Sequence, residues 1–523
     1  MSGPELGLAI FATVDICLRY VPRFQTYTIR SPSLIFFLLF FSHIRHVKFI
    51  VEKYHTLKNA RTEIEERTLL VEATWLKTSQ QLAFLRRVWG SLSVGHQELQ
   101  ERIIRVLERK LDAVVQQISK LEKHSNQDSS ATLRARQAGK YALWGLKESF
   151  ENALRDLQAW QSEFDLSWLW VLHIADRVID IELARPGADQ LSAAKKVRHV
   201  LQMGPAQATG VFLEGNKLQS ARRSDIPDST FQLVELADSK RFILDSADIP
   251  VGKDPSIFRK DIRYLAAKLQ QSAADSFPLL KCHGVVPKKD SRTTETLSYD
   301  FIFKLPKGGS EPRSLRSHLL SQKIYSLGER IHLAKQLAMS TNYIHVLDIV
   351  HKNIRPESVL IFKDNEQRSK LGRSFLLGFK KFRMADGRTN LAGNSAWDEE
   401  LYRHPDRQGI EPRREYIMQH DIYSLGVCFL EIGLWESFVT PGKPNNSLAE
   451  NGSLKDGFVK LAKEKLPSKM GEKYMNVVVN CLSCLDATNK DFCNSAEFED
   501  NDGIMLGSKY IEKILLMLSE ISV

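Results

Sequence analysis

The sequence predicts a multidomain protein, in which an N-terminal all-α helical bundle precedes a C-terminal α+β domain of two lobes. Three observations support this fold class. In the first half, apolar residues recur every three or four positions over long segments. In the second half, a short polar motif lies between two apolar helical segments, and strand-like segments precede it. With 523 residues, 43% of them hydrophobic, the chain can bury more than one core.

The predicted bundle occupies residues 1–210. Its clearest segment steps by threes and fours through Leu99, Ile103, Leu107, Leu111, Val114, Ile118 and Leu121. A polar stretch follows at 124–139, and residues 143–164 resume the same period. This spacing is typical of helical bundles and predicts four to six helices.

The first twenty residues predict an amphipathic helix. Its apolar stripe is Leu6, Ile10, Val14 and Leu18. No basic residue precedes the stripe, so a secretory signal is not expected. The stripe can dock on the bundle as ordinary core, or it can lie in a membrane interface, and both alternatives are open.

Residues 21–50 interrupt the helical pattern with Pro22, Pro32 and an apolar run at 34–41. Eight apolar residues are too few to span a bilayer, which takes about 20. We interpret the segment as an insertion, such as a retained intron or a wrongly assigned exon. The alternative is a hydrophobic membrane-anchoring hairpin.

The two-lobed domain is predicted at 231–523, after a linker at 211–230, with lobes at 231–305 and 306–523. Its central motif, His351-Lys-Asn-Ile-Arg-Pro-Glu-Ser-Val-Leu360, resembles the protein-kinase catalytic loop H-R-D-L-x-x-x-N. In this comparison Lys352 stands for the arginine and Asn353 for the catalytic aspartate, while Ser358 stands for the magnesium-binding asparagine. An amide has no basic lone pair at neutral pH, so Asn353 cannot act as the base.

The flanks of this motif also resemble a kinase. An apolar stripe at 331–345 matches the helix before the loop, and a helix from Asp421 to Trp435, including Gly426, matches the buried helix after it. The first residue of that second helix, Asp421, is expected to hold the loop backbone. Pro405 and Asp406 lie where the A-P-E motif belongs.

Other kinase motifs are degenerate. Gly378 and Phe379 take the first two places of D-F-G, and no G-x-G-x-x-G loop is found between about 215 and 300. The V-A-I-K lysine has no clear counterpart near the strand candidate 241–244, and Asp261, in a helix predicted at 257–269, is the nearest substitute for the glutamate of the C helix. We therefore predict a pseudokinase that is not an enzyme, with no cofactor and no bound metal, although weak nucleotide binding without magnesium remains open. An active serine/threonine kinase is the alternative.

The cysteines and the charge restrict the class of protein. Six cysteines form no disulfide framework in a chain of this size, which indicates a reducing, cytoplasmic setting. Cys481 and Cys484 form a lone pair and predict a helix face rather than a zinc site. A net charge of +10 is modest for this length and predicts no nucleic-acid partner.

The N-terminal part resembles the HeLo domain of fungal heterokaryon-incompatibility (prion-inhibition and propagation) proteins. The resemblance rests on the opening at 5–15, on Lys140-Tyr-Ala-Leu-Trp-Gly-Leu-Lys147 and on the apolar stretch 168–174. In that family the bundle is a cell-death effector that targets membranes through its N-terminal helix. A HeLo-like bundle before a kinase-like domain is also similar to the architecture of mixed lineage kinase domain-like proteins.

This resemblance implies a programmed-cell-death or incompatibility effector whose bundle acts at membranes while the kinase-like domain receives or restrains the signal. The alternative is a scaffold whose bundle binds partner helices. Protein partners, self-association through the bundle and membrane lipids are the expected contacts, with recruitment from the cytoplasm to the plasma membrane.

Overall fold

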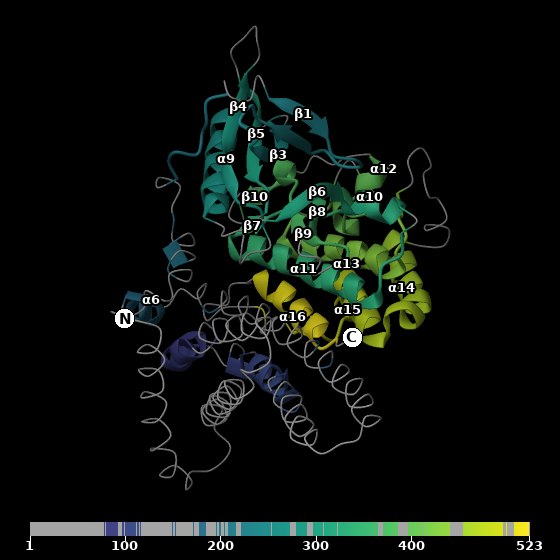
Figure 1. Cartoon of the computed structure of the whole chain (residues 1–523). Coiled ribbons are helices and arrows are strands. Elements are labelled where there is room, and N and C mark those ends of the chain that lie inside the picture. Colours follow the sequence, from purple (N-terminus) through teal and green to yellow (C-terminus); the bar gives the residue numbers. More distant parts are fainter. Residues whose placement is uncertain are drawn as a thin grey trace, which may run out of the picture. The chain divides into compact units, whose positions relative to one another are not determined.

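The structure is a computed structural model of the whole chain (Figure 1). Apart from isolated positions, it describes residues 80–92, 100–110, 177–184, 208–215, 221–250, 254–271, 279–289, 296–306, 308–321, 323–364, 370–384, 396–409, 412–439, 453–494 and 507–521. The chain divides into two compact units, Met1–Lys195 and Lys196–Val523.

The described residues of the first unit are helical. Residues 80–88 and 100–110 form helical segments, and η2 (Trp89–Ser91) and α6 (Arg177–Ala184) are further helical elements. Ile103 and Leu107, two residues of the predicted apolar stripe, are buried. The predicted membrane-helix residues Leu6, Ile10, Val14 and Leu18 and the segment 21–50 lie outside the described residues. No described helix is both long enough and apolar enough to cross a bilayer.

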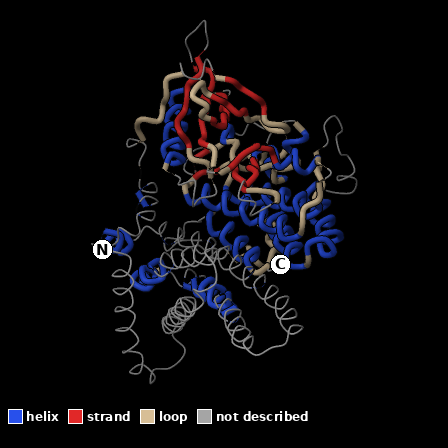
Figure 2. The backbone as a smooth tube through the Cα atoms, viewed as in Figure 1, coloured by secondary structure: helices blue, strands red, loops and turns tan. Residues whose placement is uncertain are grey.

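The second unit begins with an antiparallel five-stranded sheet in the order β1-β2-β3-β5-β4 (Figure 2). Its elements are β1 (Arg222–Asp225), β2 (Gln232–Glu235), β3 (Arg241–Asp248), α9 (Pro255–Gln270), β4 (Cys282–Lys289) and β5 (Thr296–Lys304). The α9 helix packs against β4 and β5 and starts at Asp254, whose side chain accepts a hydrogen bond from the Ser256 amide. The α9 helix includes all residues of the helix predicted at 257–269.

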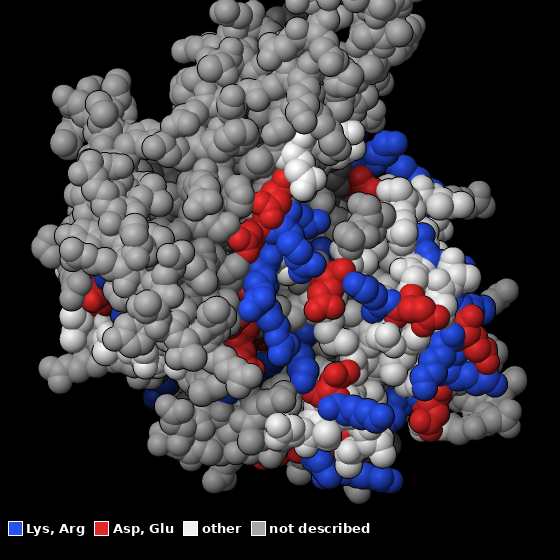
Figure 3. Space-filling model, turned by 90° about the horizontal axis from the view of Figure 1, so that it is seen from below, with Lys and Arg blue, Asp and Glu red and all other residues white. Residues whose placement is uncertain are grey.

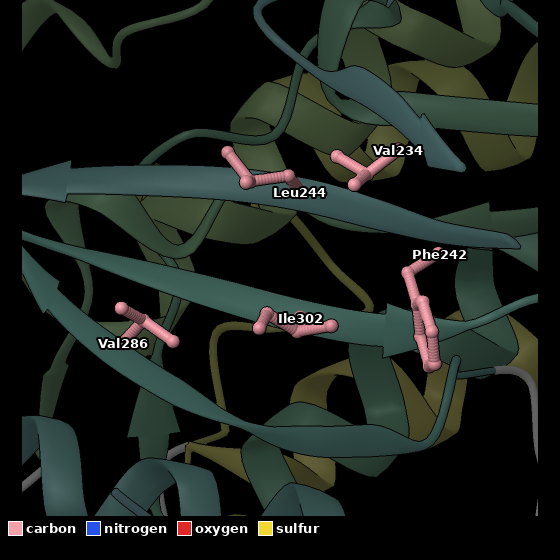
Figure 4. Close-up of a cluster of buried hydrophobic side chains, with 5 residues drawn as sticks. All are labelled: Val234, Phe242, Leu244, Val286 and Ile302. Carbon is pink, nitrogen blue, oxygen red and sulfur yellow. The ribbon is translucent and has the colours of Figure 1, made fainter. Parts of the chain in front are cut away.

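An apolar cluster covers one face of this sheet. Figure 4 shows Val234, Phe242, Leu244, Val286 and Ile302 on neighbouring strands. Because side chains alternate along a strand, Ile243 and Asp245 of β3 point to the other face. The sheet therefore supplies Asp245 to the side on which the candidate site is built.

Part of the segment predicted as a linker belongs to this sheet. The strand β1 pairs with β2, and the backbone of residues 211–213 bonds to Val285 at the β4 edge. All four β1 side chains are exposed and polar, so β1 is held by backbone hydrogen bonds and gives no apolar signal.

The rest of the unit is mostly helical. It consists of β6 (Gly309–Ser314), α10 (Leu315–Leu320), α11 (Leu327–Val346), β7 (Ile349–Val350), η6 (Pro356–Ser358), β8 (Val359–Asp364), β9 (Arg373–Leu376), η7 (Phe379–Lys381), β10 (Arg383–Met384), α12 (Trp397–Glu400), η8 (Pro405–Arg407), α13 (Met418–Leu434), α14 (Leu454–Met470), α15 (Glu472–Leu482) and α16 (Ser508–Ser519). Two small antiparallel sheets, β6-β8-β9 and β10-β7, carry the loops of the site.

The α13 helix is buried along its whole length and organises this lobe. It packs against α11, α14, α15 and α16. A side chain on Gly426 would collide with Cys481 of α15, because an added Cβ would lie 2.7 Å from the Cys481 Cβ. Gly426 therefore allows α13 and α15 to approach closely. Cys481 and Cys484 are both buried, as residues of a packed helix and its end.

Charged residues are mixed on the face seen in Figure 3. Lys and Arg side chains gather in bands among the described residues, with Asp and Glu side chains interspersed. On the described part of this face, basic side chains therefore lie among acidic ones.

Candidate functional site

The loop that resembles the kinase catalytic loop follows β7, and Asp421 of α13 holds it through hydrogen bonds to its backbone. The Asp421 Oδ2 atom accepts hydrogen bonds from the His351 amide (2.8 Å) and from His345 Nε2 (3.0 Å). Its Oδ1 atom accepts from the Lys352 amide (2.9 Å) and the Tyr416 hydroxyl (3.1 Å). In these contacts Asp421 holds the backbone of the loop at two consecutive residues.

Asp421 stays ionised although it is fully buried. Burial acts to raise its pKa, but the hydrogen bonds from His345 and from the His351 amide outweigh burial and leave the pKa lowered. A charged acceptor forms stronger hydrogen bonds than a neutral one, so the loop is held by an anionic anchor. The anchor also supports Lys352 in its left-handed backbone conformation (φ 64°).

His351 is a buried neutral ring. Burial lowers its pKa to about 4, and its Nδ1 atom accepts a hydrogen bond from the Asn353 amide (3.3 Å). The ring meets Phe379 edge to face, with 5.2 Å between the ring centroids. His351 thus connects the loop to the segment that follows β9.

The structure brings Asn353, Ser358 and Gly378 together. The Asn353 Nδ2 atom donates to the Gly378 carbonyl (3.0 Å). A Cβ on Gly378 would lie 2.7 Å from Asn353 Nδ2 and 3.0 Å from the Ser358 Cβ. In the kinase pattern these are the positions of the base and of both metal ligands, and the structure brings the three residues at these positions close together.

These side chains do not fit magnesium in the way the kinase pattern requires. Gly378 offers no carboxylate, and Ser358 Oγ is already engaged, because it donates to the Arg355 carbonyl (2.7 Å) and accepts from the Arg355 amide (3.1 Å). Magnesium prefers carboxylate oxygen ligands in octahedral geometry. We therefore derive no step through a metal at these positions.

A carboxylate of β3 occupies the opposite side of Gly378. The Asp245 Oδ2 atom accepts from the amides of Gly378 and Phe379, both at 3.0 Å. Asp245 directly follows the strand segment 241–244, near which the kinase pattern has its lysine. Burial raises the pKa of Asp245 to about 6, and its Oδ1 atom has no hydrogen-bond partner. Sequence reasoning missed Asp245, because its role depends on residues more than 130 positions away.

The α9 helix connects to the site through its C-terminal end. Lys268 is 1% exposed, and its Nζ atom donates to the Leu347 carbonyl (2.6 Å) at the end of α11. Asp261, the residue expected to replace the helix glutamate, is half-buried on α9.

A buried ion network joins α10 to α13, and no local sequence pattern predicts it. Arg316 donates to Glu357 (2.9 Å) and to Glu431 (2.7 Å), and it also contacts the Tyr402 hydroxyl. Tyr402 in turn donates to Glu431 (2.7 Å). Glu357 belongs to the catalytic-like loop, so this network and Asp421 fix the loop from two directions.

His404, Asp406 and His420 form a compact group, in which one possible ligand atom of each residue lies within 4.8 Å of those of the other two. Both rings accept a backbone hydrogen bond at Nδ1, from the amides of Asp406 (3.2 Å) and Ile417 (3.0 Å). A neutral ring that accepts at Nδ1 carries its proton at Nε2, whereas a metal-binding histidine donates its second nitrogen to an acceptor. These rings therefore have no lone pair available for a metal. Pro405 and Asp406 lie in η8, near the start of α13.

Two curated relatives are protein kinases. The chain is 24% identical over 131 residues to a Raf homolog serine/threonine-protein kinase of Caenorhabditis elegans, covering 23% of this chain and 15% of the relative. It is 29% identical over 161 residues to mitogen-activated protein kinase kinase 9 of Arabidopsis thaliana, covering 30% of this chain and 45% of the relative. The chain thus spans less than half the length of these relatives. No family model matches it.

These similarities identify a kinase-related signalling domain and correct one expectation. The prediction that the chain is not an enzyme is contradicted, because the relatives are protein kinases. The motifs suggest inactivity because Asn353, Ser358 and Gly378 each depart from the kinase pattern at a reactive position. The HeLo resemblance receives no support from these comparisons and remains a hypothesis.

Proposed function

We propose that residues 196–523 transfer phosphate to a serine or threonine hydroxyl of a partner protein, at a low rate. The support comes from the kinase relatives and from one structural observation: Asp421 holds the loop of His351 and Lys352 through both carboxylate oxygens. Positioning of reacting groups is the larger part of catalysis in this class.

The chain's own residues set the expected rate. Asn353 can orient an attacking hydroxyl but cannot accept its proton, and general-base catalysis contributes about 10²–10⁴-fold to such reactions. We expect phosphate transfer to be slower by about that factor than in a kinase with an aspartate at this place.

Radiolabelled phosphate transfer from ATP to a mixed protein acceptor tests this proposal with the full chain. The informative variant is Asn353→Leu, which keeps the side-chain size but cannot bond the Gly378 carbonyl. The matched control is Asn494→Leu at an exposed position. Transfer that falls at least about tenfold in Asn353→Leu alone supports the proposal. Undetectable transfer in the wild type, or equal transfer in all three proteins, contradicts it.

We further propose that the N-terminal bundle acts at membranes, which rests on the HeLo resemblance of residues 1–210. The protein would then be a cytoplasmic cell-death effector recruited to the plasma membrane, and binding of partner helices is the alternative role of the bundle. Dye release from anionic liposomes by the full chain tests this idea. Release that is lost in a folded Ile10→Arg variant supports membrane action by the first helix. Release that is unchanged in this variant contradicts it.

A further inference from the structure

The turn between β1 and β2, residues 226–231, ends in a fully buried aromatic ring. Phe231 is 1% exposed, whereas Pro227, Asp228 and Thr230 of the same turn are exposed. Its Cζ atom lies 3.7 Å from the position that a Cβ would take on Gly378. The ring therefore reaches from the five-stranded sheet to the group formed by Asn353, Ser358 and Gly378.

This location matters because of what the turn does in the kinase pattern. There the corresponding turn is a glycine-rich loop that covers the nucleotide phosphates, and the groups at the positions of Ser358 and Gly378 hold the metal that bridges those phosphates. The Phe231 ring approaches the second of these positions, Gly378, and so lies beside the space that the phosphates and their metal take in that pattern. A phosphate chain bound there would compete with the ring for this space.

Internal hydrogen bonds fix the shape of the turn. The Ile226 amide donates to the Phe231 carbonyl (3.0 Å), as expected where two antiparallel strands are joined. The Ser229 hydroxyl donates to the Ile226 carbonyl (2.8 Å) and accepts from the Phe231 amide (3.2 Å). The ring is thus presented by an ordered turn.

A further hydrogen bond ties the turn to the other lobe. Ser314, which is fully buried at the start of α10, donates from its hydroxyl to the Pro227 carbonyl (2.9 Å). The same oxygen accepts from the Ser317 amide (3.0 Å) and so caps α10. Opening the turn therefore requires the loss of this bond and the exposure of the Phe231 ring.

We propose that the β1–β2 turn is an autoinhibitory closure, in which Phe231 blocks the approach of nucleotide phosphates and Ser314 holds the turn shut. Only the consequence for nucleotide rests on the proposed phosphate transfer. A partner or modification that releases the turn would turn the domain on, because a site that is competent in only a small fraction of molecules binds its ligand correspondingly weakly.

Thiol labelling tests the closure without any nucleotide. Ser358→Cys places a thiol of similar size beside Gly378, the residue that the Phe231 ring approaches, and labelling is followed by mass spectrometry of the peptides. We expect slow labelling in Ser358→Cys alone and labelling at least about tenfold faster when Phe231→Ala is added, because the closed fraction of molecules no longer protects the site. Phe242→Ala is the matched control, because Phe242 is a buried ring on the opposite face of the same sheet. Buried Cys282 of β4 reports general unfolding in every sample.

The hydrogen bond from Ser314 has its own control. Ser314→Ala removes both the contact to Pro227 and the cap of α10, whereas Ser326→Ala removes only the equivalent cap of α11. We expect faster labelling of the thiol in Ser358→Cys with Ser314→Ala and no change with Ser326→Ala.

Titration with a fluorescent ATP analogue then separates the two proposals. Binding at least about tenfold tighter in Phe231→Ala than in the wild type supports the closure. If the thiol is uncovered but no variant binds nucleotide, the closure stands and the proposed phosphate transfer fails. A change of less than twofold in the labelling rate on adding Phe231→Ala contradicts the closure. If the wild type binds the ATP analogue and Phe231→Ala binds it no more tightly, the closure is also contradicted.

Discussion

Replacing Asp245 with asparagine should remove a dependence of stability on pH between about 4 and 6. Burial raises the pKa of this carboxyl to about 6 in the folded protein, against an ordinary value of 3.8. Between these two values the folded protein binds more protons than the unfolded chain. Stability therefore falls as the pH rises through this range, because the buried carboxylate becomes ionised.

The size of the effect follows from the difference between the two pKa values. One pKa unit corresponds to about 1.4 kcal/mol, so ionised Asp245 costs about 3 kcal/mol of unfolding free energy above pH 6. Asparagine keeps an oxygen that can accept from the Gly378 and Phe379 amides. Its NH₂ group replaces Oδ1, which has no partner, and this costs about 1–3 kcal/mol at every pH. The pH dependence is thus the diagnostic quantity.

Urea unfolding at pH 4 and pH 7.5 measures this difference. The stability of Asp245→Asn relative to the wild type should increase by about 2–3 kcal/mol between the two pH values. Asp248→Asn is the matched control, because Asp248 is exposed at the end of the same strand, and it should show little change. An equal pH dependence in Asp245→Asn and the wild type would refute the reasoning.

Two further substitutions test the site by urea unfolding. Asp421→Ala leaves the amides of His351 and Lys352 without their acceptor and should cost about 3–5 kcal/mol, whereas Asp406→Ala, at a partly exposed position, should cost less than about 1 kcal/mol. Gly378→Ala combines a φ of 88° with a Cβ 2.7 Å from Asn353 and should cost about 2–4 kcal/mol. Gly409→Ala has a similar φ of 82° in open space and should cost about 1–2 kcal/mol. Equal costs at the two glycines, or a loss below about 1 kcal/mol in Asp421→Ala, would contradict these assignments.

The elements predicted best from the sequence are those encoded locally. The helix at 331–345 lies within α11, the helix from Asp421 matches α13, and the loop between them adopts the predicted contacts. Their signals are apolar periodicity and a short motif, both contained in a few consecutive residues. Asn353, Ser358 and Gly378, which the kinase pattern assigns to one site, lie close together in the structure.

The contacts that the sequence did not reveal join distant segments. Asp245 acts on Gly378 across 133 positions, and Arg316 reaches Glu431 across 115. Phe231 is the first residue of the predicted lobe at 231–305, and no local pattern indicates that its ring lies near Gly378. Nothing in the local sequence distinguishes a buried carboxylate or ring of this kind from an ordinary strand residue, since their partners are set by the packing of two lobes.

The departures from the kinase pattern around Gly378 depend on one another. Its amide donates to Asp245 and its carbonyl accepts from Asn353, while the missing side chain leaves room for Ser358 and for the Phe231 ring. An aspartate at position 353 would bring a carboxylate against the Gly378 carbonyl, with no proton to share between two acceptors. That contact would raise the pKa of the new carboxyl or push the Gly378 peptide away, which in turn would disturb the bonds to Asp245. A base at position 353 is therefore compatible with this site only when the peptide at Gly378 and the carboxylate of β3 change together.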